Sequence, residues 1–234
     1  MDSNPRMIQG QLSDFLRYLA EHDNAGSDRL PSLSDLSREM GVSIASLREQ
    51  LEVARALGFV EVRPKTGIRR LPYTFQPSVV QSLSYAVAID PDYFVYFADL
   101  RRHIETAYWY EAAALLTAGD IAELESLVRV AKAKLKLNPP QIPHAEHRDL
   151  HLKIFGKLNH PFVLGILESF WSLYEASGMN YYSDLNYLEK VWQYHERIVA
   201  ALVAGNLELG YNALVEHMDL INLRAKPINR QNFE

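Results

Sequence analysis

The sequence of 234 residues contains no cysteine, and this absence removes several kinds of chemistry. A chain without thiols has no disulfide framework, no cysteine nucleophile and no thiolate zinc site. Any metal site must therefore rest on histidine, aspartate or glutamate. The sequence also lacks an apolar run near the roughly 18 residues of a membrane span, and its N-terminus lacks the basic and then apolar layout of a signal peptide. We therefore expect a cytoplasmic protein without a membrane partner.

A large excess of charge is missing as well, because 24 Lys and Arg oppose 29 Asp and Glu. The distribution of these charges is more informative than the net value of −5. Residues 29–70 carry eight basic and five acidic side chains, whereas residues 76–234 carry 14 basic and 19 acidic side chains. The simplest interpretation is a short basic module attached to an acidic body. The 48% hydrophobic content is enough to give each part a core.

Two prolines within residues 72–78 interrupt the helical pattern, so we place a linker there and predict domains at 1–75 and 76–234. Upstream, the pattern predicts a helix around residues 12–19, helices over 33–41 and 44–57, and a β-hairpin within 59–73. Downstream, caps and apolar periodicity predict about seven helices across 78–225. The expected fold is mainly α, with a winged helix-turn-helix followed by an all-α bundle of six or seven helices.

Three short helices followed by a hairpin are typical of a winged helix-turn-helix, whose third helix enters the major groove of double-stranded DNA. Gly41 would supply the turn before that helix, and Ser43 would cap it. A helical protein-interaction domain with an incidental hairpin is the alternative interpretation. The residues that we expect to contact DNA, through bases or phosphates, are Ser32, Arg38, Ser43, Ser46, Arg48, Lys65, Thr66 and Gly67.

Residues 30–67 resemble the N-terminal domain of the GntR family of bacterial regulators. The matching features are Leu30-Pro31-Ser32, Leu36, Gly41-Val42-Ser43, Leu47-Arg48-Glu49, Leu51, Leu57-Gly58-Phe59-Val60 and Gly67. The resemblance implies binding to operator DNA, with a base contact carried over to Arg48. Two positions depart from the family pattern, because Ile44 replaces an arginine and Ser46 replaces a proline.

Four of the eight histidines lie on apolar stripes of three predicted helices. His147 and His151 are four residues apart, and His195 and His217 are each surrounded by apolar residues at helical spacing. A single histidine in such a position is more often a hydrogen-bonded core residue than a ligand. If the helices pack together, however, four neutral imidazoles can converge on a divalent ion such as Zn²⁺ or Ni²⁺. A metal-free receptor, whose histidines bond to an effector or to one another, is the alternative.

Residues 90–225 resemble the FCD effector domain of the FadR branch of the GntR family. The resemblance rests on Leu100-Arg101 with Glu105, Asn159-His160-Pro161, Tyr194-His195-Glu196-Arg197-Ile198, and His217 at 22 residues after His195. Metal-binding members use an aspartate and three histidines, and here His147 stands at the aspartate position. The resemblance therefore implies a site of four histidines, His147, His151, His195 and His217, with a small organic acid held beside the metal.

We assign Arg101 and Glu105 to the effector site, because a guanidinium offers a planar fork to a carboxylate. A structural salt bridge between these two residues, which are four apart on one predicted helix, is the alternative. The sequence thus predicts a metabolite-responsive regulator that binds operator DNA as a homodimer and is not an enzyme. The rival hypothesis is a metal-dependent enzyme with an appended winged helix, but four histidine ligands leave little room for a reactive water.

Overall fold

The structure is a computed structural model that describes residues 10–22, 28–64, 66–176 and 184–224. The chain divides into two compact units, residues 1–81 and residues 82–234. This division falls six residues after the predicted boundary, within helix α5 (Gln76–Ile89). Each unit has a hydrophobic core of its own, and each is described separately below.

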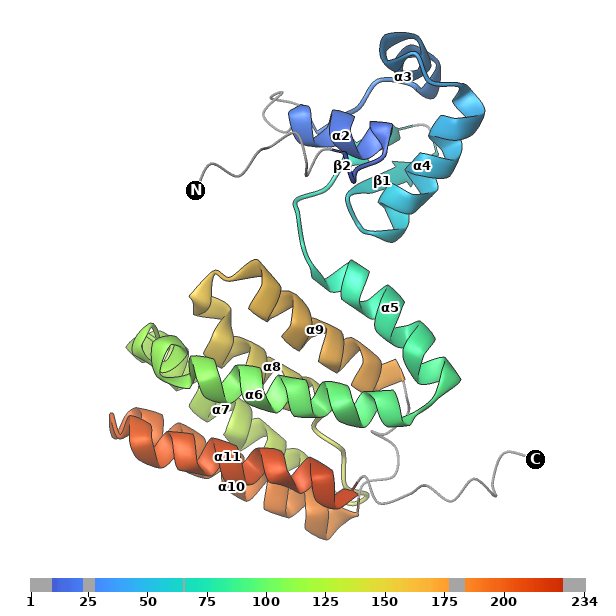
Figure 1. The fold of residues 1–234 in the computed structure, drawn as a ribbon. Coiled ribbons are helices and arrows are strands. Elements are labelled where there is room, and N and C mark those ends of the chain that lie inside the picture. The colour runs from blue at the N-terminus through green and yellow to red at the C-terminus, as the bar shows by residue number, and fades with distance from the viewer. Residues whose placement is uncertain (1–9, 23–27, 65, 177–183, 225–234) are drawn as a thin grey trace, which may run out of the picture. The chain divides into compact units, whose positions relative to one another are not determined.

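The first unit contains three helices and a hairpin, in the predicted order (Figure 1). Its elements are α2 (Asp14–Glu21), α3 (Leu33–Met40), α4 (Ile44–Ala56), β1 (Val60–Arg63) and β2 (Gly67–Arg70). Phe15, Leu36 and Leu47 are fully buried where the three helices meet, and Val60 and Ile68 bring the hairpin onto the same core. The predicted winged helix-turn-helix architecture is therefore confirmed.

Local caps explain where α3 and α4 begin and end. The Ser32 side chain accepts a hydrogen bond from the backbone N–H of Asp35, and Gly41 ends α3 with a φ of +66°. The Ser43 side chain accepts from the N–H of Ser46 at the start of α4. Glycine adopts the left-handed conformation at no steric cost, and serine satisfies a backbone donor that the helix leaves unpaired. The predicted turn at Gly41 and cap at Ser43 are confirmed.

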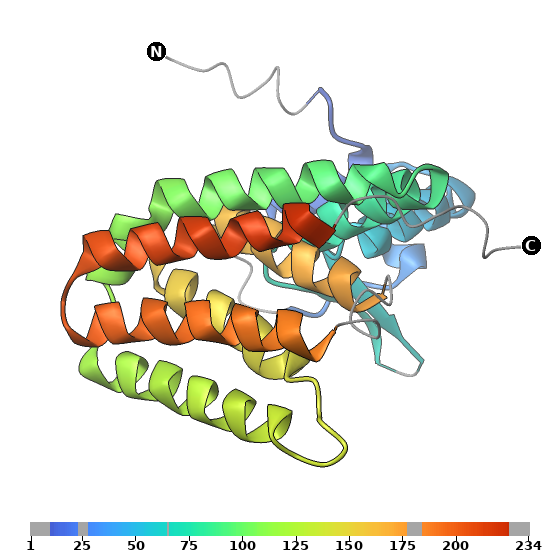
Figure 2. The same cartoon turned by 90° about the horizontal axis from the view of Figure 1, so that it is seen from below.

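The second unit is helical throughout its described residues. Its helices are α6 (Asp92–Ala114), α7 (Ala118–Leu135), α8 (His144–Phe155), α9 (Pro161–Ala176), α10 (Leu185–Val203) and α11 (Leu207–Arg224), with a single 3₁₀ turn, η1 (Gly156–Leu158), after α8. With α5, the described residues after position 75 form seven α-helices, as predicted. Figure 2 shows α6 along one side of this bundle and α7 along the opposite side.

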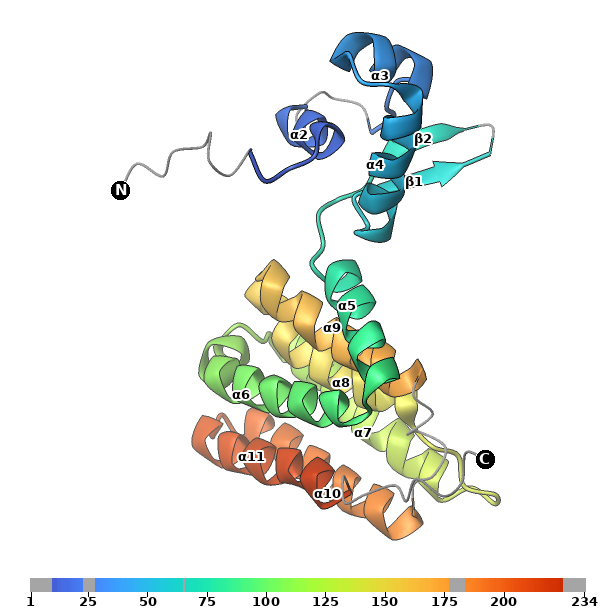
Figure 3. The same ribbon diagram turned by 45° about the vertical axis from the view of Figure 1, so that its right-hand side comes forward.

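Helices α6 and α11 pack closely, as Figure 3 shows, because a glycine faces an indole ring between them. A Cβ atom added to Gly210 would lie 2.5 Å from Cζ2 of Trp109. The Trp109 Nε1–H donates a hydrogen bond of 2.8 Å to the carbonyl of Leu207 at the start of α11.

Among the described residues, no helix is long and apolar enough to cross a membrane.

Candidate functional site

Four imidazoles from three helices meet inside the second unit. His147 and His151 lie one turn apart on α8, His195 comes from α10 and His217 from α11. One ring nitrogen from each of the four histidines lies within 4.8 Å of the others. Of the three helices that carry them, only α10 and α11 follow each other in the sequence. His151 and His195 are fully buried, and His217 is 5% exposed. The convergence expected from the sequence is observed, while the role of these rings as ligands stays a prediction.

The nitrogen atoms of the cluster face one another at short range. The Nε2 atom of His151 lies 3.2 Å from Nε2 of His195 and 3.2 Å from Nε2 of His217. The buried Nε2 atom of His147 has no hydrogen-bond partner among the described residues. A neutral imidazole has one N–H and one lone pair, so these facing nitrogens cannot all satisfy one another. A cation at the centre would satisfy the lone pairs, so the donor set fits a metal ion.

Burial keeps the cluster uncharged. It is the largest influence on the pKa of each of the four histidines, and it lowers the pKa in every case. For His147, His195 and His217 the pKa falls well below the usual value. The rings are therefore neutral at pH 7, and neutral imidazole is the form that binds a metal.

A buried ion pair on α6 fixes the orientation of His151. The Glu105 Oε2 atom lies 2.7 Å from Nδ1 of His151, and Arg101 Nε donates a hydrogen bond of 2.6 Å to Glu105 Oε1. Burial would raise the pKa of Glu105, but the charge of Arg101 and the contact with His151 outweigh it and lower the pKa. The ionised carboxylate holds the His151 N–H on Nδ1, which turns the lone pair of Nε2 toward the cluster.

The salt bridge considered as an alternative role for Arg101 is thus present, and it leaves part of the guanidinium unused. Arg101 is 3% exposed, and its Nη2 atom has no hydrogen-bond partner among the described residues. The guanidinium carbon lies 4.1 Å from the ring centre of Phe170 and 4.6 Å from that of Trp171. Arg101 can therefore hold Glu105 and still donate to a further acceptor.

A cavity of about 20 Å³ lies between the guanidinium and two of the four histidines. It is lined by Arg101, His147, Phe170, Trp171, Tyr174, Tyr187, His217 and Met218. The Trp171 Nε1 atom, like Arg101 Nη2, is a buried donor with no partner among the described residues. The aromatic wall on α9 could not be predicted from the sequence, because an apolar run on a helix indicates only burial.

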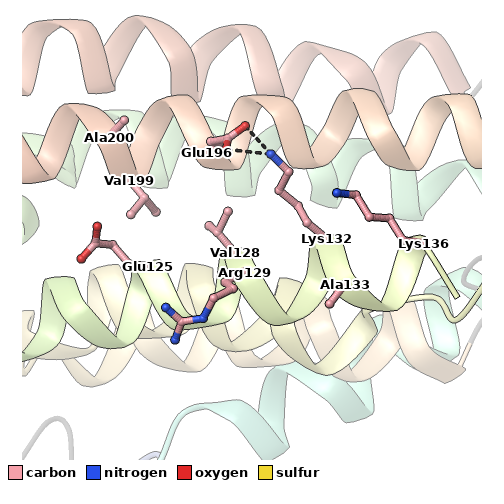
Figure 4. Close-up of a pocket in the computed structure, with 9 residues that line it drawn as sticks. All are labelled: Glu125, Val128, Arg129, Lys132, Ala133, Lys136, Glu196, Val199 and Ala200. Atoms are coloured by element: carbon pink, nitrogen blue, oxygen red, sulfur yellow. Dashed lines mark hydrogen bonds and ion pairs between the residues drawn. The ribbon is translucent and has the colours of Figure 1, made fainter.

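A larger groove of about 590 Å³ lies elsewhere, between α7 and α10. Figure 4 shows the Lys132–Glu196 ion pair, with 2.7 Å between Nζ and Oε1, crossing this groove beside Arg129 and Lys136. No histidine lines it, and the two partners of the ion pair are 40% and 52% exposed. The smaller cavity, in contrast, combines buried donors without partners with possible metal ligands, which are the features expected of a ligand site.

The residues expected to contact DNA lie at helix starts and at the hairpin tip of the first unit. Ser32 and Ser43 are exposed caps, Arg38 is exposed on α3, and Arg48 is exposed on the second turn of α4. Ser46 is half-buried, and its hydroxyl accepts a hydrogen bond from Gln50. Thr66 and Gly67 are exposed in the hairpin, whereas Lys65 lies outside the described residues. Contact of these side chains with DNA stays a prediction.

Comparisons with known proteins identify a family and several relatives that this chain matches. The model of the FCD domain matches residues 97–220, which is more than half of the chain. A protein of Escherichia coli (strain K12) named "Putative L-lactate dehydrogenase operon regulatory protein" is 26% identical over 230 residues, which cover 95% of this chain and 88% of that protein. A Shigella flexneri protein of the same name matches equally well.

Solved structures share the fold at low sequence identity. "Streptococcus agalactiae GntR" superposes with a TM-score of 0.62 at 16% identity, over 90% of this chain and 96% of that chain. A structure described by the words "Lar controls the expression of the Listeria monocytogenes agr system" has a TM-score of 0.52 at 16% identity, over 96% and 97% of the two chains. The chain belongs to the FCD-domain branch of the GntR family of transcriptional regulators.

Proposed function

We propose that the helical unit senses a small carboxylate effector beside a divalent metal ion, Zn²⁺ or Ni²⁺, held by His147, His151, His195 and His217. The observation that carries this proposal is that two members of a four-imidazole cluster, His147 and His217, line one small cavity together with a guanidinium that has an unused donor. Neutral nitrogen donors suit Zn²⁺ and Ni²⁺ better than hard cations such as Mg²⁺ or Ca²⁺. When bound, the ion would supply positive charge and an attachment point for an anion.

The charges around the cavity favour an anionic effector. The four rings are neutral, and Glu105 balances only Arg101. A divalent ion would therefore leave the site with about two uncompensated positive charges, which is costly in a buried place. A carboxylate would offset part of this charge and accept hydrogen bonds from the unused donors of Arg101 and Trp171.

The small size of the cavity suggests how effector binding is transmitted. About 20 Å³ holds one water molecule and not an organic acid. An acid must therefore favour an arrangement of the bundle in which the α9 side chains Phe170, Trp171 and Tyr174 have moved outward. A ligand shifts an equilibrium only by as much as it prefers one arrangement, so this widening is the source of the signal.

At the DNA, we propose that two copies place their α4 helices about one helical turn apart on a palindromic operator. Arg48 would contact base edges, while Ser32, Arg38, Ser43, Ser46, Thr66 and Gly67 would contact bases or phosphates, together with Lys65. The acid that binds in the helical unit would change the balance between arrangements of the two DNA-binding units, and thereby the affinity for the operator.

A thermal-shift screen of Zn²⁺-loaded protein against small carboxylic acids tests this proposal. Lactate and other 2-hydroxy acids belong in the screen, because the name of the E. coli relative refers to an L-lactate dehydrogenase operon. We expect at least one acid to raise the Tm of the wild type and of Arg102→Lys, a control next in sequence that pairs with Asp219 outside the cavity. Arg101→Lys, which loses the planar fork, and Trp171→Phe, which loses one N–H, should respond less.

Two results would contradict the proposal. If no acid shifts the Tm of metal-loaded protein, the effector site is wrong. If the same acids stabilise metal-free protein equally, the receptor works without a metal, and the histidines bond directly to the acid or to one another.

A further inference from the structure

The first turn of helix α4 exposes an apolar side chain that the fold of the first unit does not use. Ile44, the first residue of α4, is 39% exposed. The hydrophobic core takes up Met40 and Val42 just before it and Leu47 just after it, but among the described residues Ile44 is not part of that core. Packing within the protein therefore does not explain an isoleucine at this position.

The rest of this turn offers little else to a surface placed against it. Residues 43–47 include no Asp, Glu, Lys or Arg. Ser43 and Ala45 are exposed but short, and the half-buried Ser46 already accepts a hydrogen bond from Gln50. The methyl groups of Ile44 are therefore the main feature of the exposed surface at the start of α4.

Arg48 is the neighbour of Ile44 on the helix surface. Residues four apart on a helix lie on the same side, with their Cβ atoms about 5–6 Å from each other. Both side chains are exposed. Base pairs follow one another at about 3.4 Å along the duplex, so side chains at this spacing reach base pairs within about two steps of each other. If Arg48 contacts a base edge, Ile44 faces the same groove.

We propose that Ile44 recognises the methyl group of a thymine, within about two base pairs of the base that Arg48 contacts. On the base edges of the major groove, the C5 methyl of thymine is the apolar group, and the other groups are hydrogen-bond donors and acceptors. An isoleucine placed against the edge of guanine, adenine or cytosine would displace water without replacing its hydrogen bonds. Ile44 would thus determine specificity, and this role rests on the proposed entry of α4 into the major groove.

The size of the effect follows from the small area involved. Burial of one methyl group changes a binding constant by about fourfold, and the same contact in two half-sites by about fifteenfold. Ile44 would therefore rank related operators, while the charged residues of the first unit provide most of the affinity for any duplex.

Selection from a randomised DNA duplex with the full-length protein tests this inference. Arg48→Ala identifies the enriched sequences whose binding depends on α4. We expect each half-site to contain a thymine that Ile44→Ala no longer prefers, whereas the control Val53→Ala, at a 52% exposed valine later in α4, keeps the preference. Ile44→Arg should select guanine at the same position, because a guanidinium donates to O6 and N7 of guanine.

Replacement of that thymine by deoxyuridine tests the methyl group alone, because the base pair keeps its hydrogen bonds. Fluorescence anisotropy should show binding about fourfold weaker for each substituted half-site with the wild type and with Val53→Ala. Ile44→Ala should bind both duplexes equally.

The possible outcomes distinguish this inference from the proposed recognition of DNA by α4. If no sequence is enriched, or if Arg48→Ala binds the enriched sequences as well as the wild type does, α4 does not read bases and both claims fail. If binding depends on Arg48 but the wild type tolerates deoxyuridine at every thymine, only the role of Ile44 is overturned. Retention of thymine by Ile44→Arg would overturn it as well.

Discussion

The Nδ1 atom of His151 lies 2.7 Å from the Oε2 atom of Glu105, and this contact connects the histidine cluster to helix α6. Both side chains are fully buried, and the other carboxylate oxygen is held by Arg101. One carboxylate therefore orients a candidate metal ligand and a candidate effector-binding residue together. This makes Glu105 the residue through which the two halves of the site influence each other.

Replacing Glu105 by glutamine should weaken metal binding without removing a ligand. The amide cannot stabilise the His151 N–H as a carboxylate does, and loss of such a partner typically lowers metal affinity by about 10–100-fold. Competition titration of Zn²⁺ with a chelator measures this. Glu111→Gln, an exposed position on the same helix, is the control. Equal affinity of Glu105→Gln and Glu111→Gln would show that the contact does not orient His151.

The metal-free protein should lose stability in mild acid. Burial lowers the pKa of the four histidines in the folded state, whereas those of an unfolded chain titrate near about 6.5. Below that pH the unfolded chain takes up protons that the folded chain does not. The stability is thus fully present above about pH 7 and is lost as the pH falls, by up to about 1.4 kcal/mol per pH unit for each histidine.

Urea unfolding at pH 7.5, 6.5 and 5.5 in the presence of a chelator checks this expectation. His217→Leu should show a shallower pH dependence than the wild type. His103→Gln, which changes a 67% exposed histidine, should not. A free energy of unfolding that is the same at pH 7.5 and pH 5.5 would contradict the buried, neutral state of the cluster.

Much of this architecture could be predicted from local signals in the sequence. The residue types at Ser32, Gly41 and Ser43 indicate two helix caps and a turn. These signals predict the ends of α3 and α4 to within one residue. The histidine cluster was predictable because its members lie on the apolar helix faces that also carry Ile154 and other core residues. A polar side chain on an apolar face must find partners when helices pack, and four such residues can find one another.

The cavity and its donors could not be predicted in the same way. Phe170, Trp171 and Tyr174 read as ordinary core residues, and only the packed bundle shows that the Trp171 N–H lacks a partner. The role of Arg101 also depended on packing. The sequence left a salt bridge and an effector contact as alternatives, whereas the structure contains the salt bridge and leaves Nη2 unused. Hydrogen-bond satisfaction is a property of three-dimensional contacts and not of spacing.

Loss of the Arg48 side chain should weaken sequence-specific DNA binding. Arg48 is exposed on the second turn of α4, and its guanidinium forms no ion pair with another described residue. Removal of a base contact typically costs about 1–3 kcal/mol. Fluorescence anisotropy with operator DNA should show this for Arg48→Ala and little change for Arg55→Ala, whose side chain is paired with Glu52 near the end of α4. Equal affinities would remove Arg48 from the recognition surface.

The close approach of α6 and α11 makes Gly210 intolerant of a side chain. The added methyl group of Gly210→Ala would meet Cζ2 of the fully buried Trp109 at 2.5 Å, and such overpacking costs about 1–3 kcal/mol. Gly156→Ala is the matched control, because an added Cβ there meets nothing within 4 Å. Thermal unfolding should show a lower Tm for Gly210→Ala alone. An unchanged Tm would mean that α6 and α11 are less tightly packed.

The most direct test of the central claim is the metal content of protein purified without a histidine tag. Elemental analysis by mass spectrometry should find one Zn²⁺ or Ni²⁺ ion per chain in the wild type and in His103→Ala. His151→Ala and His195→Ala should be folded by circular dichroism but depleted of metal. A wild type that contains no stoichiometric ion, and that neither Zn²⁺ nor Ni²⁺ stabilises in thermal unfolding, would contradict the account.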